Sequence, residues 1–144
     1  MKITSARIEN AEEMCNLVKA SIVELCAIDH NNDKKELADW LCNKTIENFR
    51  FWIKDHQSFC AFNDTGEMIG IVMLNQKNEI LLNYVSPTNI KNGVGKRLLK
   101  NMEASLTKPC LIKVTPTKTA LSFYLKMGFL ADADGSEQLE KRLV

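Results

Sequence analysis

The chain has 144 residues, of which 45% are hydrophobic and 26% are charged. This size and composition are typical of one globular domain with a packed core, and they exclude a disordered chain or two domains of ordinary size. Nineteen Lys and Arg residues against eighteen Asp and Glu residues give a formal net charge of +1. General binding to nucleic acid or to an anionic membrane surface is therefore disfavoured.

No stretch of the sequence is long and apolar enough to cross a bilayer, and the segment from Met1 to Arg7 lacks the apolar core of a signal peptide. We therefore expect residues 1–144 to form a single cytoplasmic domain without a membrane partner.

The cysteines are odd in number, widely spaced and never arranged as Cys-x-x-Cys, so neither a disulfide framework nor a metal site is predicted. We expect them to be small buried apolar residues, not catalytic thiols. They are Cys15, Cys26, Cys42, Cys60 and Cys110.

The first third of the chain has mainly helical patterns. A short strand is predicted from Ile3 to Ile8, followed by a helix from about Ala11 to Cys26 whose N-cap is Asn10. A loop follows from Asp29 to Asp33, and a second helix from Lys34 to Asn43. Thr45 is expected to cap a third, short helix in which Phe49, Trp52 and Ile53 face inward.

From Ser58 onward, short apolar runs separated by turns predict strands. The strands are expected at Ser58–Phe62, Met68–Leu74 and Glu79–Val85, and their short connections favour an antiparallel meander.

The second half predicts a helix from about Gly93 to Leu106, a strand from Cys110 to Val114 and a helix from Thr117 to Met127. A strand, a helix and a strand in this order favour a parallel pair. Phe129–Ala131 and Gln138–Leu143 are predicted to form a last hairpin. The fold class is therefore α+β, with a central mixed, mostly antiparallel sheet flanked by helices.

The most informative segment is the loop that precedes the helix from Gly93. Gly93 and Gly95 open an amphipathic helix whose first N–H groups have no partner within it. Such a helix start binds phosphate groups, and cationic residues surround it here. They are Lys91, Lys96, Arg97 and Lys100.

The two common nucleotide-binding motifs do not match this loop. A dinucleotide-binding motif needs a third glycine where this chain has Leu98, and a P-loop needs Ser or Thr where it has Arg97. A helix start with only a solvated basic face is the simpler alternative.

Two segments resemble the GNAT superfamily of N-acetyltransferases. The first is Val85-x-Pro87 followed by Gly93-x-Gly95 and an amphipathic helix. The second is Ala120-x-x-Phe123-Tyr124-x-Lys126-x-Gly128-Phe129, which is similar to a sequence pattern of that family. Two positions differ: Ile90 stands where the family usually has Gln or Arg, and Thr117 where it often has Asn.

The resemblance implies an acyl-CoA N-acyltransferase-like fold and a direct transfer of acetyl from acetyl-CoA to a primary amine in a ternary complex. The pyrophosphate would bind the glycine loop, and the pantetheine arm would pair with the strand around Tyr84 and Val85. Tyr124 stands at the position of the family's general acid, although its helix face also suits a core tyrosine. The loop residues implied are Lys91, Asn92, Gly93, Val94, Gly95 and Lys96.

The acceptor amine, a small molecule or a peptide, and the base that deprotonates it are less well defined. The end of the first helix and the strand before the glycine loop carry the candidates for acceptor binding. These are Glu24, Asp29, His30 and Asn83. His56 is expected to interact with carbonyl groups at a helix end.

Two other classes of function keep the same loop. A noncatalytic acyl-CoA binding or sensing module would bind the ligand without transfer, and a phosphate-binding interaction domain would recognise another anion. The presence of Tyr124 favours the enzyme over both. Monomer and homodimer are both compatible with the sequence.

Overall fold

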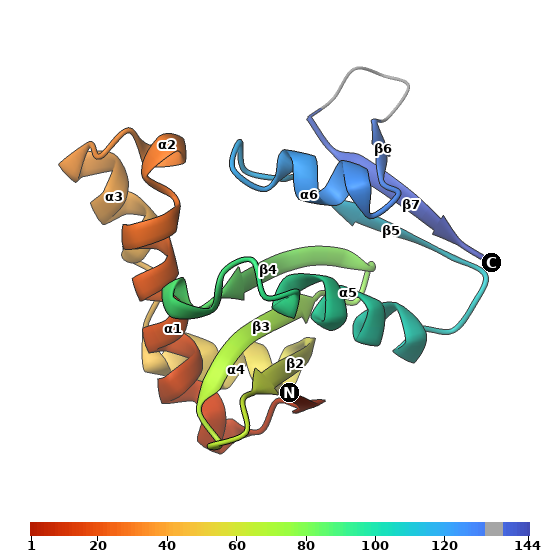
Figure 1. Cartoon of the computed structure of the whole chain (residues 1–144), viewed down its shortest axis with the longest axis horizontal. Helices are drawn as coiled ribbons and strands as arrows, with labels where there is room; N and C mark the ends of the chain where they lie inside the picture. The colour runs from red at the N-terminus through yellow and green to blue at the C-terminus, as the bar shows by residue number, and fades with distance from the viewer. Residues whose placement is uncertain (132–136) are drawn as a thin grey trace.

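The computed structural model describes residues 1–131 and 137–144, apart from the side chains of residues 27 and 28. Its strands form one seven-stranded sheet in the order β1-β2-β3-β4-β5-β7-β6, in which only β4 and β5 are parallel. The predicted fold class, a mixed and mostly antiparallel sheet flanked by helices, is confirmed (Figure 1). The strands are β1 (Lys2–Ser5), β2 (Gln57–Phe62), β3 (Met68–Leu74), β4 (Glu79–Val85), β5 (Cys110–Val114), β6 (Leu130–Ala131) and β7 (Leu139–Leu143).

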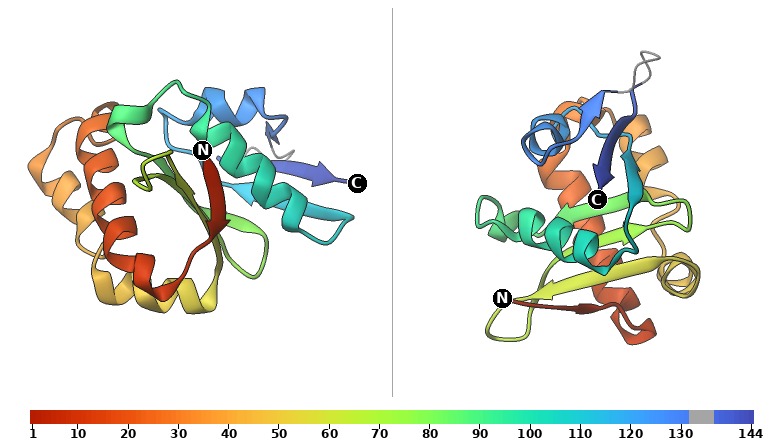
Figure 2. Two further views of the ribbon diagram at one scale, coloured as in Figure 1. Left: turned by 60° about the horizontal axis from the view of Figure 1, so that its bottom comes forward. Right: turned by 90° about the vertical axis from the view of Figure 1, so that its right-hand side faces the viewer.

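The helices cover both faces of this sheet (Figure 2). One core lies between the sheet and α1 and α4, and a second lies between the sheet and α5 and α6. Val72 and Leu74 of β3 belong to the α5 core, while Ile71 and Met73 belong to the α1 core. The α-helices are α1 (Ala11–Leu25), α2 (Ala27–His30), α3 (Lys34–Leu41), α4 (Ile46–Asp55), α5 (Val94–Ser105) and α6 (Leu121–Lys126), with short 3₁₀ turns η1 (Ile8–Asn10) and η2 (Pro87–Asn89).

The central β-meander and the helix caps agree with the sequence patterns. Strands β2, β3 and β4 pair antiparallel in succession, as predicted. The Thr45 hydroxyl caps α4 by accepting the Asn48 N–H at 3.1 Å, and Phe49 is fully buried. Gly128 ends the last helical segment with a φ of +95°, a left-handed conformation that suits glycine.

Three local predictions were wrong. Strand β1 ends at Ser5, and Ile8–Asn10 forms a 3₁₀ turn in which the Asn10 carboxamide accepts the Arg7 N–H instead of capping α1. The segment predicted as a loop from Asp29 lies partly in α2. The last helix begins at Leu121 and not at Thr117, because residues 118–120 form a turn in which the Ala120 N–H bonds to the Thr117 carbonyl at 3.1 Å.

Strand β4 separates from β5 after only two residue pairs, Glu79 with Lys113 and Ile80 with Val114. On its other edge β4 stays paired with β3 as far as Val85, with a register irregularity between Met73 and Leu74. The edge of β4 toward β5 is therefore unpaired over its C-terminal half. The two halves of the sheet diverge at this place, as Figure 1 shows.

Candidate active site

The glycine loop leaves the end of β4 and enters α5 through two left-handed residues. Lys91 has a φ of 67° and Gly93, the N-cap of α5, has a φ of 77°. In the first turn of α5, the Arg97 N–H donates a hydrogen bond to the Gly93 carbonyl at 3.1 Å. The N–H groups of Val94, Gly95 and Lys96 come before it and have no carbonyl one turn earlier in the helix. Because Gly93 has no side chain to cap them, they can bind an anion.

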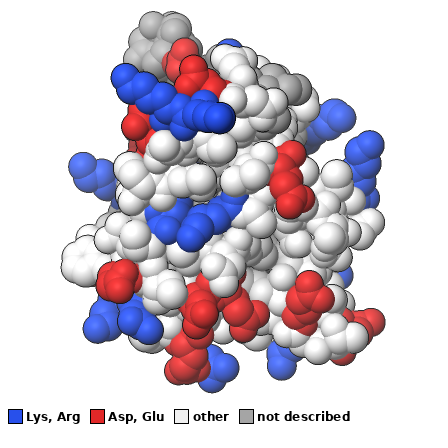
Figure 3. Space-filling model, turned by 90° about the vertical axis from the view of Figure 1, so that its left-hand side faces the viewer, with Lys and Arg blue, Asp and Glu red and all other residues white. Residues whose placement is uncertain are grey.

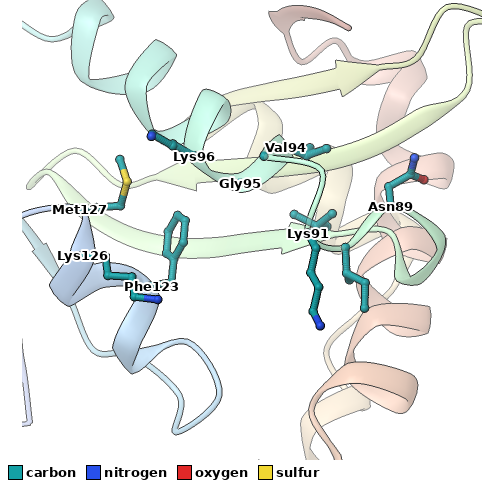
Figure 4. Close-up of a pocket in the computed structure, with 11 residues that line it drawn as sticks. Asn89, Lys91, Val94, Gly95, Lys96, Phe123, Lys126 and Met127 are labelled. Atoms are coloured by element: carbon teal, nitrogen blue, oxygen red, sulfur yellow. The ribbon is translucent and has the colours of Figure 1, made fainter.

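These N–H groups border a cavity of about 450 Å³ between the glycine loop and α6, which we call the loop cavity (Figure 4). Lys91 and Lys96 line it from the loop side, and Lys126 lines it from α6. Three lysines therefore line one space at a helix N-terminus, an arrangement suited to a polyanion. The remaining lining residues are Val85, Asn89, Ile90, Gly93, Val94, Gly95, Phe123 and Met127.

Gly95 keeps the wall of this cavity open. A Cβ atom built on it would lie 3.6 Å from the Phe123 ring and 3.6 Å from Val85, which is ordinary contact distance. The protein packing therefore tolerates a methyl group there. The absence of a side chain leaves this part of the backbone accessible from the cavity.

Most of the loop residues predicted from sequence line this one cavity, and two groups do not. Asn92 is exposed, and it is not among the lining residues. Arg97 and Lys100 are exposed on α5 and do not line it either. Lys126 lies in the second sequence segment but was not predicted as a binding residue; its place beside Phe123 and Tyr124 in that segment was the available signal.

A second, smaller cavity of about 70 Å³ lies where β4 and β5 diverge, and we call it the cleft. It contains side chains from β4 on one side and from the β5–α6 connection on the other. Tyr84 and Asn83 reach it from β4, and Tyr124 reaches it from α6. The other lining residues are Ile80, Leu81, Val114, Thr115, Pro116, Thr117 and Ala120.

Tyr124 is the buried phenol of the cleft, with 4% of its surface exposed. Its hydroxyl accepts a hydrogen bond from the Asn83 carboxamide at 3.1 Å, and its ring packs edge-to-face on Phe123 and Phe129. Burial raises the pKa of Tyr124 to about 12, although the Asn83 hydrogen bond acts in the opposite direction. The phenol is therefore protonated at neutral pH and can act as a proton donor.

A third cavity of about 560 Å³ adjoins the cleft, and we call it the side cavity. The two share Thr115, Pro116 and Thr117 as lining residues. Trp40 of α3 and Asp29 of α2 close it from the other side. The remaining lining residues are Lys118, Leu121, Glu137 and Leu139.

Among the acceptor candidates, His30 has a structural place. It is fully buried; its Nε2 is 3.0 Å from the Ile22 carbonyl, and its Nδ1 accepts the Asn32 N–H at 3.1 Å. Because Nδ1 accepts, Nε2 carries the proton and donates it to the carbonyl. Both ring nitrogens are thus used within the protein, and this geometry gives no support to His30 as a substrate contact.

The other candidates are placed differently from one another. Glu24 is exposed near the end of α1, whereas Asn83 lies in the cleft, bonded to Tyr124. Asp29 lines the side cavity, but both of its carboxylate oxygens accept hydrogen bonds from Thr119. The His56 ring does not contact a helix-end carbonyl, since its Nδ1 is buried without a hydrogen-bond partner.

The buried cysteines do not have the properties of nucleophiles. Burial raises the pKa of Cys26 to about 11 and that of Cys60 to about 12, and it also raises the pKa of Cys15. A thiol with a raised pKa is protonated at neutral pH and is a poor nucleophile. A covalent acyl-enzyme on these three residues is therefore disfavoured.

The charge on the outer surface is mixed. On the face shown in Figure 3, basic and acidic side chains occur close together, with one basic group near the middle. Within the part of the chain that the structure describes, no helix has the length and apolarity of a membrane span, and no group of three or more His, Cys, Asp or Glu side chains could hold a metal ion.

The family assignment follows from comparison with known proteins. The family model of the acetyltransferase (GNAT) domain matches residues 26–144, which include α3, the glycine loop, the cleft and Tyr124. The chain belongs to the GNAT acetyltransferase family. The resemblance inferred from the two sequence segments is thereby confirmed, and acetyl transfer is the general activity of this GNAT domain. No curated protein matches the sequence.

Solved structures of GNAT proteins have the same fold along nearly the whole chain. A GCN5-related N-acetyltransferase from Rhodopseudomonas palustris is 20% identical with a TM-score of 0.83, over 99% of this chain and 95% of that one. The PaiA N-acetyltransferase from Thermoplasma acidophilum, in complex with coenzyme A, is 25% identical with a TM-score of 0.78, and the match covers 99% of this chain and 100% of that one. An aminoglycoside 6'-N-acetyltransferase complexed with coenzyme A is 13% identical with a TM-score of 0.67, and the match covers 100% of this chain and 98% of that one.

Proposed function

We propose that this protein is an acetyl-CoA-dependent N-acetyltransferase that transfers acetyl to a primary amine by direct attack in a ternary complex. The observation that carries the proposal is the position of Tyr124, a protonated buried phenol in a cleft between β4 and β5. The cleft shares lining residues with the side cavity, and its residues Tyr84 and Tyr124 are next in sequence to Val85 and Phe123 of the loop cavity. This is the arrangement that a two-substrate transfer requires.

The loop cavity would hold the CoA pyrophosphate. The N–H groups that precede Arg97, together with Lys91, Lys96 and Lys126, provide donors and positive charge. The pantetheine arm would then run along the open edge of β4 at Tyr84 and Val85, where no β5 partner competes for the backbone groups. The coenzyme A in the Thermoplasma acidophilum relative supports this ligand.

The chemistry forms one bond and breaks another. The amine nitrogen attacks the thioester carbon, and a backbone N–H of β4 stabilises the negative charge that develops on the carbonyl oxygen. The carbon–sulfur bond then breaks, and the Tyr124 hydroxyl gives its proton to the departing thiolate. The amine loses its proton to water, and a proton from water then restores the Tyr124 phenol. Since both His30 nitrogens are occupied, we assign that residue no role as the base.

The acceptor would enter through the side cavity, because this cavity shares Thr115, Pro116 and Thr117 with the cleft. Trp40, an aromatic residue of the kind that can bind a cation, and Glu137, an acidic residue, are among its lining residues. A primary amine, which is cationic before it loses its proton, suits these groups. Its carrier can be a small molecule or a peptide.

The direct test is release of free CoA, measured with a thiol reagent, when the purified protein meets acetyl-CoA and a panel of amines. The panel contains a free amino acid, a linear diamine, an aminoglycoside and a lysine peptide, and mass spectrometry identifies the acetylated product. We expect turnover with at least one amine. Thermal stabilisation by CoA without any turnover would indicate a noncatalytic acyl-CoA binding module, and equal stabilisation by ATP would indicate a general phosphate binder.

Lys91→Gln tests the loop cavity. The change removes one positive charge from the lining but keeps a side chain of similar length, so we expect CoA to bind about 3- to 10-fold more weakly, as for the loss of one charge-assisted contact. The difference should shrink in high salt, which screens partly exposed charges. Isothermal titration with CoA at two salt concentrations measures it.

Lys100→Gln is the matched control for this change. It removes the same charge from an exposed position on α5 that does not line the loop cavity. We expect its CoA affinity to stay within about twofold of the wild type, as for an exposed charge outside the contact. Equal weakening by both variants would contradict a specific role of Lys91 and would indicate a general effect of surface charge.

A further inference from the structure

Asp29 connects two parts of the chain that are 90 residues apart in the sequence. Its carboxylate accepts a hydrogen bond from the Thr119 N–H at 3.0 Å on one oxygen and from the Thr119 hydroxyl on the other. Asp29 is in α2, among the N-terminal helices, whereas Thr119 is in the turn between β5 and α6. In Figure 1, α2 and the start of α6 lie beside each other above the open end of β4.

We expect the contact between Asp29 and Thr119 to contribute to the stability of the fold. Asp29 is only 8% exposed, and its two hydrogen bonds bring together residues 90 positions apart. A buried carboxylate that loses its donors is costly. The Thr119 N–H lies just before the first residue of α6, Leu121, and its partner is Asp29.

The turn held by Asp29 leads directly to Tyr124. Thr119 precedes Ala120, whose carbonyl accepts the Tyr124 N–H at 3.2 Å in the first turn of α6. The Tyr124 hydroxyl is then bonded from β4 by Asn83. Since α6 has only six residues, its orientation depends on such external contacts more than that of a long helix.

We propose that Asp29 is a positioning residue for Tyr124, acting through Thr119 and the first turn of α6, and does not contact the acceptor. The inference rests on the proposed acetyl transfer, in which Tyr124 is the proton donor. It assigns Asp29 a different role from the acceptor contact predicted from the sequence, because each carboxylate oxygen accepts a hydrogen bond from Thr119.

Two substitutions distinguish a positioning role of Asp29 from a direct contact with the acceptor. Asp29→Ala removes both acceptors, and Thr119→Val removes the hydroxyl while leaving the N–H. If the contact positions Tyr124, both variants should lower kcat by about 5- to 100-fold, since a small misplacement of a catalytic group has effects of this size. The KM values for acetyl-CoA and for the amine with the highest rate in the panel should stay within about twofold. The double variant should be no worse than Asp29→Ala, because the residues act as a pair.

Matched variants give the control and the rescue. Asp33→Ala also removes a carboxylate with two backbone donors, at the N-cap of α3, and we expect it to lower stability but not kcat. Thr119→Ser keeps the hydroxyl and should behave like the wild type. A higher KM for the amine with unchanged kcat in Asp29→Ala, or wild-type kinetics in Thr119→Val, would overturn the proposal.

A measurement without turnover separates this proposal from the proposed function. The chain has two tyrosines, so NMR of ring-labelled tyrosine gives two sets of signals, which Tyr124→Phe assigns. Asp29→Ala and Thr119→Val should shift the Tyr124 signals in the protein with CoA present, and Asp33→Ala should not. If the wild type has no turnover but these shifts occur, the enzyme proposal fails and the positioning role holds. Unchanged Tyr124 signals in both variants would refute the positioning role whatever the activity.

Discussion

Replacement of Tyr124 by Phe is expected to lower kcat by about 100- to 1,000-fold, within the range for loss of a general acid, while the affinity for CoA stays nearly unchanged. The change removes only the hydroxyl that Asn83 contacts, and the ring contacts with Phe123 and Phe129 remain. The thiolate would then have to leave without a proton donor. Steady-state release of CoA gives kcat, and titration with CoA gives the affinity.

The pH dependence gives a second check of the same role. Because the pKa of Tyr124 is raised to about 12, the phenol stays protonated from neutral pH to about pH 10. Wild-type kcat should therefore rise or level off over this range as the amine loses its proton, with no fall from ionisation of Tyr124. Turnover of Tyr124→Phe within twofold of the wild type would rule out Tyr124 as the acid.

Tyr84→Phe is the comparison variant, since it removes the only other phenol of the chain and lines the same cleft. Tyr84 is proposed to bind the pantetheine arm through its backbone, which the substitution leaves intact. We expect its loss of kcat to be well below that of Tyr124→Phe. Equal losses would indicate a general disturbance of the cleft and would not support a specific proton donor.

Gly70→Ala is expected to destabilise the fold by about 1–3 kcal/mol, the usual effect of overpacking a core. A Cβ atom on Gly70 would lie 2.7 Å from a methyl group of Val94 and 2.8 Å from one of Leu98, both on α5. These side chains are buried and cannot move away freely. Chemical denaturation measures the free energy of unfolding, and the melting temperature should fall by about 2–4 °C per kcal/mol.

Gly95→Ala is the matched control for Gly70→Ala. The Cβ added there meets its neighbours at 3.6 Å, and Gly95 is within α5, where alanine is favoured. We expect the free energy of unfolding to be unchanged or higher, whereas CoA should bind at least about 10-fold more weakly if the ligand approaches this backbone. Equal destabilisation by both substitutions, or none by either, would contradict the packing of α5 on β3 described above.

The sequence predicted the elements well wherever one face of an element is buried by its near neighbours. Helix α1 and strands β2, β3 and β4 lie where predicted. Their apolar residues recur at the spacing that the local backbone geometry of a helix or a strand imposes. The predictions were wrong at element ends. Asn10 has the residue type of a helix cap, but its carboxamide accepts the Arg7 N–H in a 3₁₀ turn, and residues 118–120 form a turn before the last helix.

The candidate site was only partly predictable from the sequence, because some of its contacts join segments that are distant in the chain. The glycine loop and the segment around Tyr124 are local sequence patterns, so the sequence indicates a phosphate-binding helix start and a phenol on a helix. Neither pattern contains the divergence of β4 from β5, which depends on strand pairing across the sheet. The contact between Asn83 and Tyr124 joins residues 41 positions apart and exists only because of that pairing.

Length, composition and charge predicted one domain and disfavoured a general attraction for nucleic acid, and the sequence by itself placed cationic residues at one helix that begins with glycines. Tertiary structure alone decided which of them share a cavity, Lys91 and Lys96 with Lys126, and which point elsewhere, Arg97 and Lys100. It also decided that His30 and Asp29 bond to the protein itself. A residue's type sets the contacts that it can make, but the packing of distant segments determines which partner it meets.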